Sequence, residues 1–208
     1  MARTRSIRAH EDVLNAALEL IAARGIDVTS MDAIADASGV SKATIYKYWP
    51  TKEALCLEAI GSVNGELPPC DSGDARADLI QILRHVAQKR NSGPAAKLWP
   101  RVIGHAAGNP AFRDALKARF DEPRRAQIKR LIADAIERGQ LRPDVDTDLA
   151  MDLLVGPVMH RCFCNTVIPA DLPERVVGAF WKAWGTESGA VSREVTSREV
   201  PQQLTAYY

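Results

Sequence analysis

Helical periodicity along nearly the whole chain is the feature that most restricts its fold. Apolar residues recur at spacings of three and four, as in Leu14, Leu18 and Ile21, while sustained alternation of apolar and polar residues is scarce. Gly- and Pro-rich breaks divide the later part of this pattern into helices expected near residues 75–91, 95–107, 111–138, 146–165 and 172–184. The sequence therefore predicts an all-α protein.

Composition and charge narrow the class of protein. The 208 residues are 46% hydrophobic and 25% charged, as in ordinary globular proteins that bury a core without disulfides. Because 27 Lys and Arg face 26 Asp and Glu, any nucleic-acid binding has to come from a local patch. We expect a cytoplasmic protein with no membrane partner, because the sequence shows neither an apolar leader nor a run long enough to span a bilayer.

Two short helices expected between residues 29 and 48 form the clearest motif. Residues 29–32 fit an N-terminal cap, Gly39 stands where the turn can require a positive φ, and Ser41 caps the second helix. The small core between the helices is expected to comprise Ile34, Val40, Ile45 and Tyr48, with Trp49 also buried. This arrangement is a helix-turn-helix, which places the start of its second helix in the major groove of DNA.

The second helix of this motif offers groups that suit DNA. Residues 41–52 contain three Lys and no acidic residue, and Tyr46 and Tyr48 flank Lys47. Ammonium and hydroxyl groups serve both phosphates and base edges, although such a stretch taken alone is more often a plain solvated surface. An N-terminal arm that contacts the DNA backbone or minor groove is expected from Arg3, Arg5 and Arg8.

Residues 10–60 resemble the DNA-binding domain of the TetR family of bacterial transcriptional regulators, along LNAALELIAARGIDVTSMDAIADASGVSKATIYKYWPTKEAL. The resemblance implies a homodimer with an N-terminal three-helix helix-turn-helix domain and a larger C-terminal helical domain for ligand binding and dimerisation. It implies a regulator, most often a repressor, that binds a palindromic double-stranded DNA operator and is released by a small-molecule ligand. Matching positions imply DNA contacts by Lys42, Ala43, Thr44, Tyr46, Lys47 and Tyr48, and phosphate contacts by Ser41 and Lys52.

The chain divides into three expected parts. Residues 61–74 are rich in Gly, Pro and Ser, the composition of a loop. We therefore expect a DNA-binding domain over 1–60, a ligand-binding and dimerisation domain over 61–185, and a disordered tail over 186–208. The sequence assigns no function to the tail.

The last two expected helices are apolar on more than one face. A helix of this kind must be covered on both sides, either by its own core or by a two-fold partner that completes a four-helix interface. With the family resemblance, dimerisation is the favoured interpretation. The expected interface comprises Leu149, Leu153, Gly156, Val177, Phe180, Trp181 and Trp184.

The ligand pocket is expected among the central helices. Its candidate lining residues are Trp99, Val102, Ile103, Phe120, Met159 and Phe163. Core packing explains each of these apolar residues equally well. His85, His105 and His160 are candidate polar anchors, and Pro100, Pro123 and Pro157 are expected to end or kink their helices.

A redox- or metal-responsive sensor that uses Cys162 and Cys164 is the alternative function. On a helix, however, His160 and Cys164 share a face while Cys162 points away, so no metal site is predicted. Phosphate-loop, dinucleotide-binding and nucleophile-elbow motifs do not occur in the sequence. We therefore expect neither a catalytic site nor a cofactor.

Overall fold

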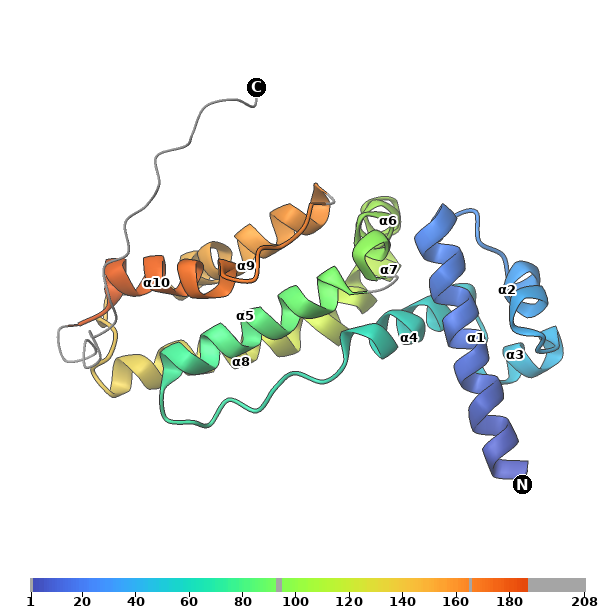
Figure 1. Ribbon diagram of the computed structural model, residues 1–208, viewed down its shortest axis with the longest axis horizontal. Helices are drawn as coiled ribbons and strands as arrows, with labels where there is room; N and C mark the ends of the chain where they lie inside the picture. The colour runs from blue at the N-terminus through green and yellow to red at the C-terminus, as the bar shows by residue number, and fades with distance from the viewer. Residues whose placement is uncertain (1, 93–94, 165, 187–208) are drawn as a thin grey trace.

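The computed structural model describes residues 2–92, 95–164 and 166–186, and this part of the chain is helical without strands. The prediction of an all-α protein is confirmed (Figure 1). Apart from Thr186, the tail predicted over 186–208 lies outside the described residues. The elements are α1 (Ala2–Arg24), α2 (Met31–Ser38), α3 (Lys42–Tyr48), α4 (Lys52–Asn64), α5 (Ala75–Asn91), α6 (Ala95–Gly108), α7 (Pro110–Leu116), the π-helical turn η1 (Lys117–Asp121), α8 (Glu122–Glu137), α9 (Thr147–Phe163) and α10 (Leu172–Trp184).

Helices α1 to α4 occupy one end of the molecule, with α1 packed against α2 and α4 (Figure 1). Hydroxyl groups begin the three short helices, because Ser30, Ser41 and Thr51 each accept a hydrogen bond from the backbone N–H three residues on, at 3.1, 3.3 and 3.1 Å. Gly39 ends α2 with φ of 69°, a conformation that costs little only for glycine. Local sequence signals thus determine the bounds of the helix-turn-helix.

Two expectations for this end of the molecule were wrong. Residues 2–8 belong to α1, so the arginines predicted to form an arm lie on a helix instead. Tyr48 is 46% exposed, whereas Trp49 is 2% exposed and occupies the core together with Ile45. The reason is helical phase, since Trp49 lies one turn after Ile45 and on the same side.

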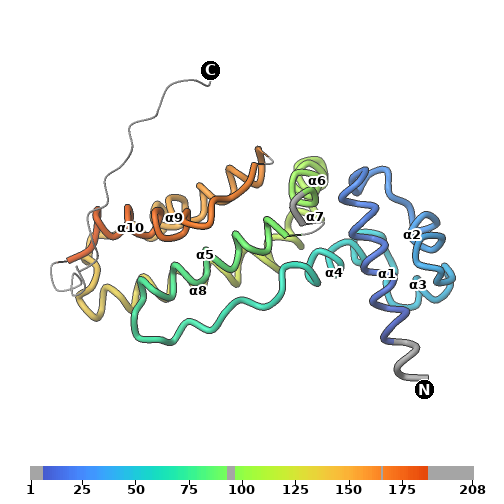
Figure 2. Tube along the Cα trace, viewed as in Figure 1, coloured from blue at the N-terminus to red at the C-terminus, as the bar shows by residue number. Residues whose placement is uncertain are grey.

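The C-terminal helices form a second layer of packing. Helix α5 lies against α8, and α9 and α10 pack against both each other and α5 (Figure 1). The core here includes Leu79, Ile82, Ile132, Leu154 and Phe180. The segment 65–74 runs along α8, where Gln127 and, just past the end of the helix, Arg138 donate hydrogen bonds to its backbone carbonyls at 2.9 and 2.7 Å (Figure 2).

The core around α1 to α4 continues beyond the domain boundary predicted at residue 60. Helix α4 runs through that boundary to Asn64, and α6 packs against α1. Trp99 and Val102 of α6 belong to the same buried cluster as Ile21 and Leu55. Helices α1 to α4 are therefore joined to the C-terminal helices by a shared hydrophobic core rather than by a flexible linker.

The prolines act differently from one another. Helices α6 and α9 continue past Pro100 and Pro157. The long helix predicted over 111–138 is continuous helical backbone made of α7, η1 and α8. The π-helical turn η1 shifts the hydrogen-bond register of this backbone just before Pro123. A π turn holds one more residue than an α turn and changes the direction of the side chains on it.

Candidate nucleic-acid interface and internal pocket

Helix α3 presents a polar surface supported by buried apolar residues. Ile45 and Trp49 point into the core and are 0% and 2% exposed. The residues expected to contact DNA from α3 and its cap are all exposed: Ser41, Lys42, Ala43, Thr44, Tyr46, Lys47 and Tyr48. This surface has the size and polarity that a major groove accepts.

A carboxylate holds the end of α3 in place. Glu58 of α4 accepts a hydrogen bond from the Trp49 indole N–H at 2.8 Å and contacts His10 Nε2 at 2.7 Å. The His10 and Trp49 rings lie 4.6 Å apart. Glu58 thus ties α1, α4 and the end of α3 together. Sequence reasoning missed it, because a single Glu on a helix gives no sign that it faces inward.

The three lysines near α3 have different surroundings. Lys42 pairs with Asp32 at 2.6 Å, and this hydrogen bond raises the pKa of Lys42, while both side chains stay exposed to solvent. Lys47 is exposed and has no ion pair among the described residues. Lys52 donates hydrogen bonds to the backbone carbonyls of Ile26 and Asp27 at 2.9 and 3.4 Å, which closes the loop between α1 and α2.

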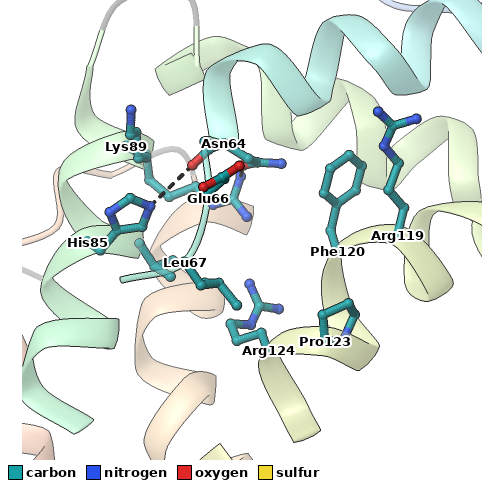
Figure 3. Close-up of a pocket in the computed structure, with 12 residues that line it drawn as sticks. Asn64, Glu66, Leu67, His85, Lys89, Arg119, Phe120, Pro123 and Arg124 are labelled. Atoms are coloured by element: carbon teal, nitrogen blue, oxygen red, sulfur yellow. Dashed lines mark hydrogen bonds between the residues drawn. The ribbon is translucent and has the colours of Figure 1, made fainter. Parts of the chain in front are cut away.

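A cavity of about 270 Å³ lies between the end of α4, α5 and the η1–α8 segment (Figure 3). Of the predicted pocket residues it includes Phe120, and of the candidate polar anchors His85, whose Nε2 lies 3.2 Å from the Asn64 carbonyl oxygen. The lining comprises Asn64, Gly65, Glu66, Leu67, His85, Val86, Lys89, Arg90, Arg119, Phe120, Pro123 and Arg124.

The other predicted pocket residues lie elsewhere. Trp99 and Val102 are buried in the core that α6 shares with α1, and Phe163 is 67% exposed at the end of α9. Ile103 and Met159 are half-buried and do not line this cavity. Trp99 and Val102 fill the core instead of leaving a space beside them.

Two buried arginines face this cavity. Arg90 is 6% exposed, with its guanidinium 3.2 Å from the centre of the Trp99 ring and Nη1 3.3 Å from Asn64 Oδ1. Burial, together with the nearby charge of Arg124, lowers the pKa of Arg90 to about 9. Arg124 is 8% exposed and pairs with Asp121 at 2.6 Å. Arg90 remains charged at neutral pH, as a buried cation.

The candidate histidines and cysteines separate in space. His105 is buried and its Nδ1 lies 2.7 Å from Asp27 Oδ1, which links α6 to the loop after α1. Cys162 is buried and Cys164 is exposed, with Cys164 Sγ 3.7 Å from His160 Nε2. Burial raises the pKa of the Cys162 thiol even though two arginines lie near. Within the described residues no group of three or more His, Cys, Asp and Glu could hold a metal ion.

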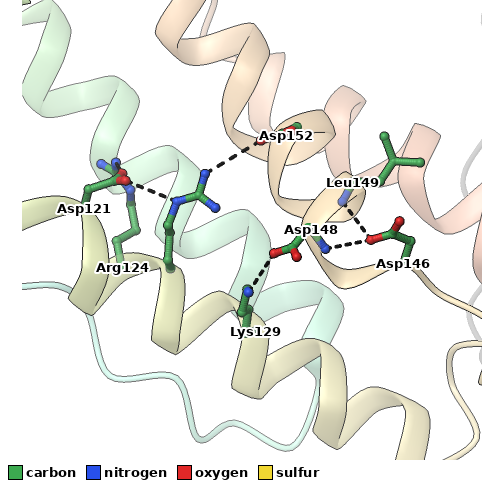
Figure 4. Close-up of polar contacts among 8 residues, drawn as sticks. Asp121, Arg124, Lys129, Asp146, Asp148, Leu149 and Asp152 are labelled. Atoms are coloured by element: carbon green, nitrogen blue, oxygen red, sulfur yellow. Dashed lines mark hydrogen bonds and ion pairs between the residues drawn. The ribbon is translucent and has the colours of Figure 1, made fainter. Parts of the chain in front are cut away.

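The surface of α9 is partly apolar. Leu149 and Leu153 are 47% and 44% exposed, and Gly156 beside them is also exposed. The start of α9 is fixed by Asp146, which accepts hydrogen bonds from the N–H groups of residues 148 and 149, and by the Lys129–Asp148 ion pair at 2.7 Å (Figure 4). That ion pair lowers the pKa of Asp148.

The α10 half of the expected interface points inward. Val177, Phe180 and Trp181 are 0%, 3% and 9% exposed because they pack against α5 and α9 of the same protomer. Val177 and Phe180 therefore offer almost no surface of one protomer to a partner, and their place in a dimer interface stays a prediction. Trp184 is half-buried. None of the helices in the described part is both long and apolar enough to cross a membrane.

Comparison with known families agrees with this architecture at both ends of the chain. Residues 13–59 match the model of the bacterial regulatory proteins of the tetR family. Residues 69–180 match the model of the tetracyclin repressor-like C-terminal domain. The two matches together extend from α1 to α10.

Individual proteins give the same result. The transcriptional regulator YdeS of Bacillus subtilis is 31% identical over 160 residues, which is 76% of this chain and 80% of the relative. The DNA-binding transcriptional repressor TetR of Mycobacteroides abscessus is 29% identical over 72% of this chain and 79% of its own. The crystal structure of the TetR family transcription regulator SCO0332 superposes with a TM-score of 0.60 at 31% identity, over 84% of this chain and 97% of the other. The chain therefore belongs to the TetR family of bacterial transcriptional regulators and is a DNA-binding protein.

Proposed function

We propose that the protein is a homodimeric repressor that leaves its operator when a small molecule occupies the cavity beside α4. The observation that carries this proposal is the course of α4, which starts at Lys52 next to α3 and ends at Asn64 in the cavity wall. Its 13 residues span about 20 Å as one rigid element. A ligand that displaces the end of α4 therefore moves the DNA-binding helix as well.

The DNA contact is proposed for the exposed side of α3. Lys42, Thr44, Tyr46 and Lys47 offer ammonium and hydroxyl groups to base edges and phosphates, and Ala43 and Tyr48 offer apolar contact. Ser41 and Lys52 are proposed to meet phosphates with the hydrogen-bonding capacity that remains beside their contacts within the protomer.

A second connection between the domains supports the coupling. His105 of α6 contacts Asp27 in the loop after α1, and Lys52 donates to the carbonyl of that same residue. The loop before α2 is thus held from both α4 and α6. A ligand acts on DNA affinity only if it prefers one arrangement of these helices, so the coupling requires different ligand affinities in the two arrangements.

The dimer is proposed to form across α9 and the exposed side of α10. Leu149, Leu153 and Gly156 make a partly apolar stripe that one protomer leaves open, and Trp184 of α10 is half-buried. A two-fold axis would bring the same stripe from a partner against it. Val177, Phe180 and Trp181 would support this surface from behind.

The operator is tested by footprinting the purified protein on DNA that flanks its own coding region, over a series of salt concentrations. A palindromic footprint of about 15 to 20 base pairs is expected, because each recognition helix occupies one major-groove half-site of a two-fold site. Protection without sequence preference that disappears at moderate salt would contradict operator recognition. The repressor role is supported by the relative from Mycobacteroides abscessus that carries that name.

The dimer is tested by the double variant Leu149→Glu, Leu153→Glu, with the molar mass measured by light scattering. We expect the mass to fall from that of a dimer to that of one chain, because like charges would face each other across the axis. Val28→Glu is the matched control, since Val28 is 64% exposed and lies at the DNA-binding end. A double variant that stays dimeric would place the interface elsewhere.

A further inference from the structure

The cavity beside α4 is lined by more positive than negative charge. Lys89, Arg90, Arg119 and Arg124 line it, whereas Glu66 is the one acidic residue in the lining. Among the described residues, the only carboxylate paired with any of these cations is Asp121, which binds Arg124. Lys89 and Arg119 are exposed at its edge, whereas Arg90 and Arg124 are buried in its wall.

Arg90 carries the strongest argument for an anionic ligand. It is 6% exposed and has no carboxylate partner among the described residues, so its charge is stabilised by the Trp99 ring and the Asn64 amide oxygen. A buried cation without an ionic partner is unfavourable, and such groups in proteins are normally paired. A site that keeps one gains the missing interaction when an anion binds.

In the part of the chain that the structure describes, three residues of the cavity lining carry buried hydrogen-bond donors without an acceptor. Among the described residues, the Nε groups of Arg90 and Arg124 and the Nδ2 group of Asn64 are buried and have no partner. All three residues line the cavity, and Figure 3 labels Asn64 and Arg124 among them. Buried donors are satisfied in nearly all native structures, so these N–H groups require an acceptor. A carboxylate, which only accepts hydrogen bonds and can bind Arg through both oxygens, supplies what is missing.

The rest of the lining indicates the chemical character of the remainder of the ligand beyond its anionic group. Leu67, Val86, Phe120 and Pro123 give the cavity an apolar side. The volume of about 270 Å³ lies at the lower end of ligand pockets. We propose that the cavity binds a small organic carboxylate, with its carboxylate group between Arg90 and Arg124 and its apolar body against Leu67 and Phe120. This inference rests on the proposed function only for the consequence of binding, not for binding itself.

The test is calorimetric titration of the DNA-free protein with matched pairs of compounds. The panel consists of straight-chain carboxylates from acetate to octanoate and aromatic ones from benzoate to phenylbutyrate, each with its primary amide, plus inorganic phosphate at equal ionic strength. We expect at least one carboxylate to bind about tenfold or more tightly than its amide, because the amide adds a donor where acceptors are needed. Equal binding of every pair, no binding by any carboxylate, or tighter binding of phosphate than of all carboxylates would overturn the proposal.

Arg90→Met assigns the binding to the cavity. Loss of carboxylate binding by at least about 30-fold is expected, together with a Tm that rises by about 2 °C or more, because an unpaired buried charge is replaced by an apolar side chain of similar length. Arg76→Met is the matched control on the same helix, since Arg76 is exposed and does not line the cavity. Arg90→Lys keeps the charge without the planar donors and is expected to weaken binding about tenfold. Unchanged carboxylate binding in Arg90→Met or in Arg90→Lys would overturn the site.

Failure of this inference is distinguishable from failure of the proposed function. A carboxylate that binds the DNA-free protein but leaves the footprint unchanged would contradict the ligand response and leave the anion site intact. A neutral compound that releases the DNA while no carboxylate binds would contradict the anion site and leave the ligand response intact.

Discussion

Two groups of cations in this molecule differ in their contact with water. Lys42 and Lys47 on α3 are exposed, whereas Arg90 and Arg124 beside α4 are 6% and 8% exposed. The exposed lysines keep their hydration and therefore change the folding stability of the free protein very little. The arginines have lost most of their hydration before any ligand arrives. An exposed cation attracts anionic groups at long range and can bind many of them. A buried cation binds only an anion whose charge and shape match its site.

Salt provides the largest expected contrast between the two groups. DNA binding is expected to weaken about 1,000-fold or more between 50 and 200 mM salt, with a logarithmic slope of about −5 to −7, because three or four phosphate contacts per protomer release counterions. Carboxylate binding in the cavity is expected to change by less than about fivefold over this range, since buried pairs are screened weakly. Fluorescence anisotropy for DNA and calorimetry for the carboxylate measure the two slopes. Equal slopes would show that the cavity is open to solvent.

Cysteine alkylation measures the burial of two thiols, one of which, Cys162, lies near Arg90 and Arg124. Burial raises the pKa of Cys162 although Arg90 and Arg124 lower it in part, and burial raises the pKa of Cys56 to about 12. A raised pKa leaves less thiolate at pH 8, so iodoacetamide is expected to modify both residues at least about 100-fold more slowly than exposed Cys164. Peptide mass spectrometry over time measures the rates, and urea-unfolded protein serves as the control. Rapid reaction of Cys162 in the native protein would instead support a thiol sensor.

Lys47→Ala tests whether the exposed cations read bases as well as phosphates. We expect affinity for the operator to fall about tenfold or more and affinity for random DNA to fall much less, with Tm unchanged, because Lys47 is exposed. Quantitative gel-shift titrations on both DNAs give the ratio, with Lys97→Ala on α6 as a control. An equal loss on both DNAs would limit Lys47 to phosphate contact.

Lys52→Ala provides the contrast for that variant. It is expected to weaken binding to both DNAs alike, and also to lower Tm by a few degrees because the carbonyls of Ile26 and Asp27 lose a donor. A selective loss of operator affinity with an unchanged Tm would contradict this assignment.

Asp32→Asn has the smallest expected effect. Its carboxylate pairs with Lys42 and raises the pKa of that lysine, which is fully charged at neutral pH with or without the pair. Removing the carboxylate frees the ammonium and takes a negative charge from the DNA-facing side, so affinity for DNA is expected to rise about two- to fivefold. Gel-shift titration at low salt measures the change. Weaker binding by the variant would mean that Asp32 orients Lys42 for its contact.

Local signals explain what the sequence predicted well. The bounds of α5 and α10 match the expected helices at 75–91 and 172–184, because caps and prolines lie next to the apolar pattern they delimit. Spacing placed Ile45 of α3 correctly in the core but put Tyr48 there as well, and the exposed residues of α3 followed from the family resemblance. Such features depend on residues within a turn or two of each other.

The cavity could not be predicted in this way. Asn64, Arg90 and Arg124 lie on different helices and come together through packing that no local pattern records. Arg90 stands in a polar stretch with Lys89 and Asn91 that has the composition of a solvated surface. The sequence pattern assigned Trp99 to the pocket and Phe180 to the interface, yet an apolar pattern does not reveal which neighbour covers it. Burial of a charge becomes visible only in three dimensions.

The π-helical turn over residues 117–121 has a consequence for chain length. Such a turn accommodates one surplus residue, so deleting one residue there restores ordinary helical hydrogen bonding. The buried stripe of α8, with Ile128, Leu131 and Ile132, would keep its phase, while the presentation of Arg119 and Phe120 would change. Insertions and deletions at this point therefore offer a route by which related chains could alter what they bind without rebuilding their core.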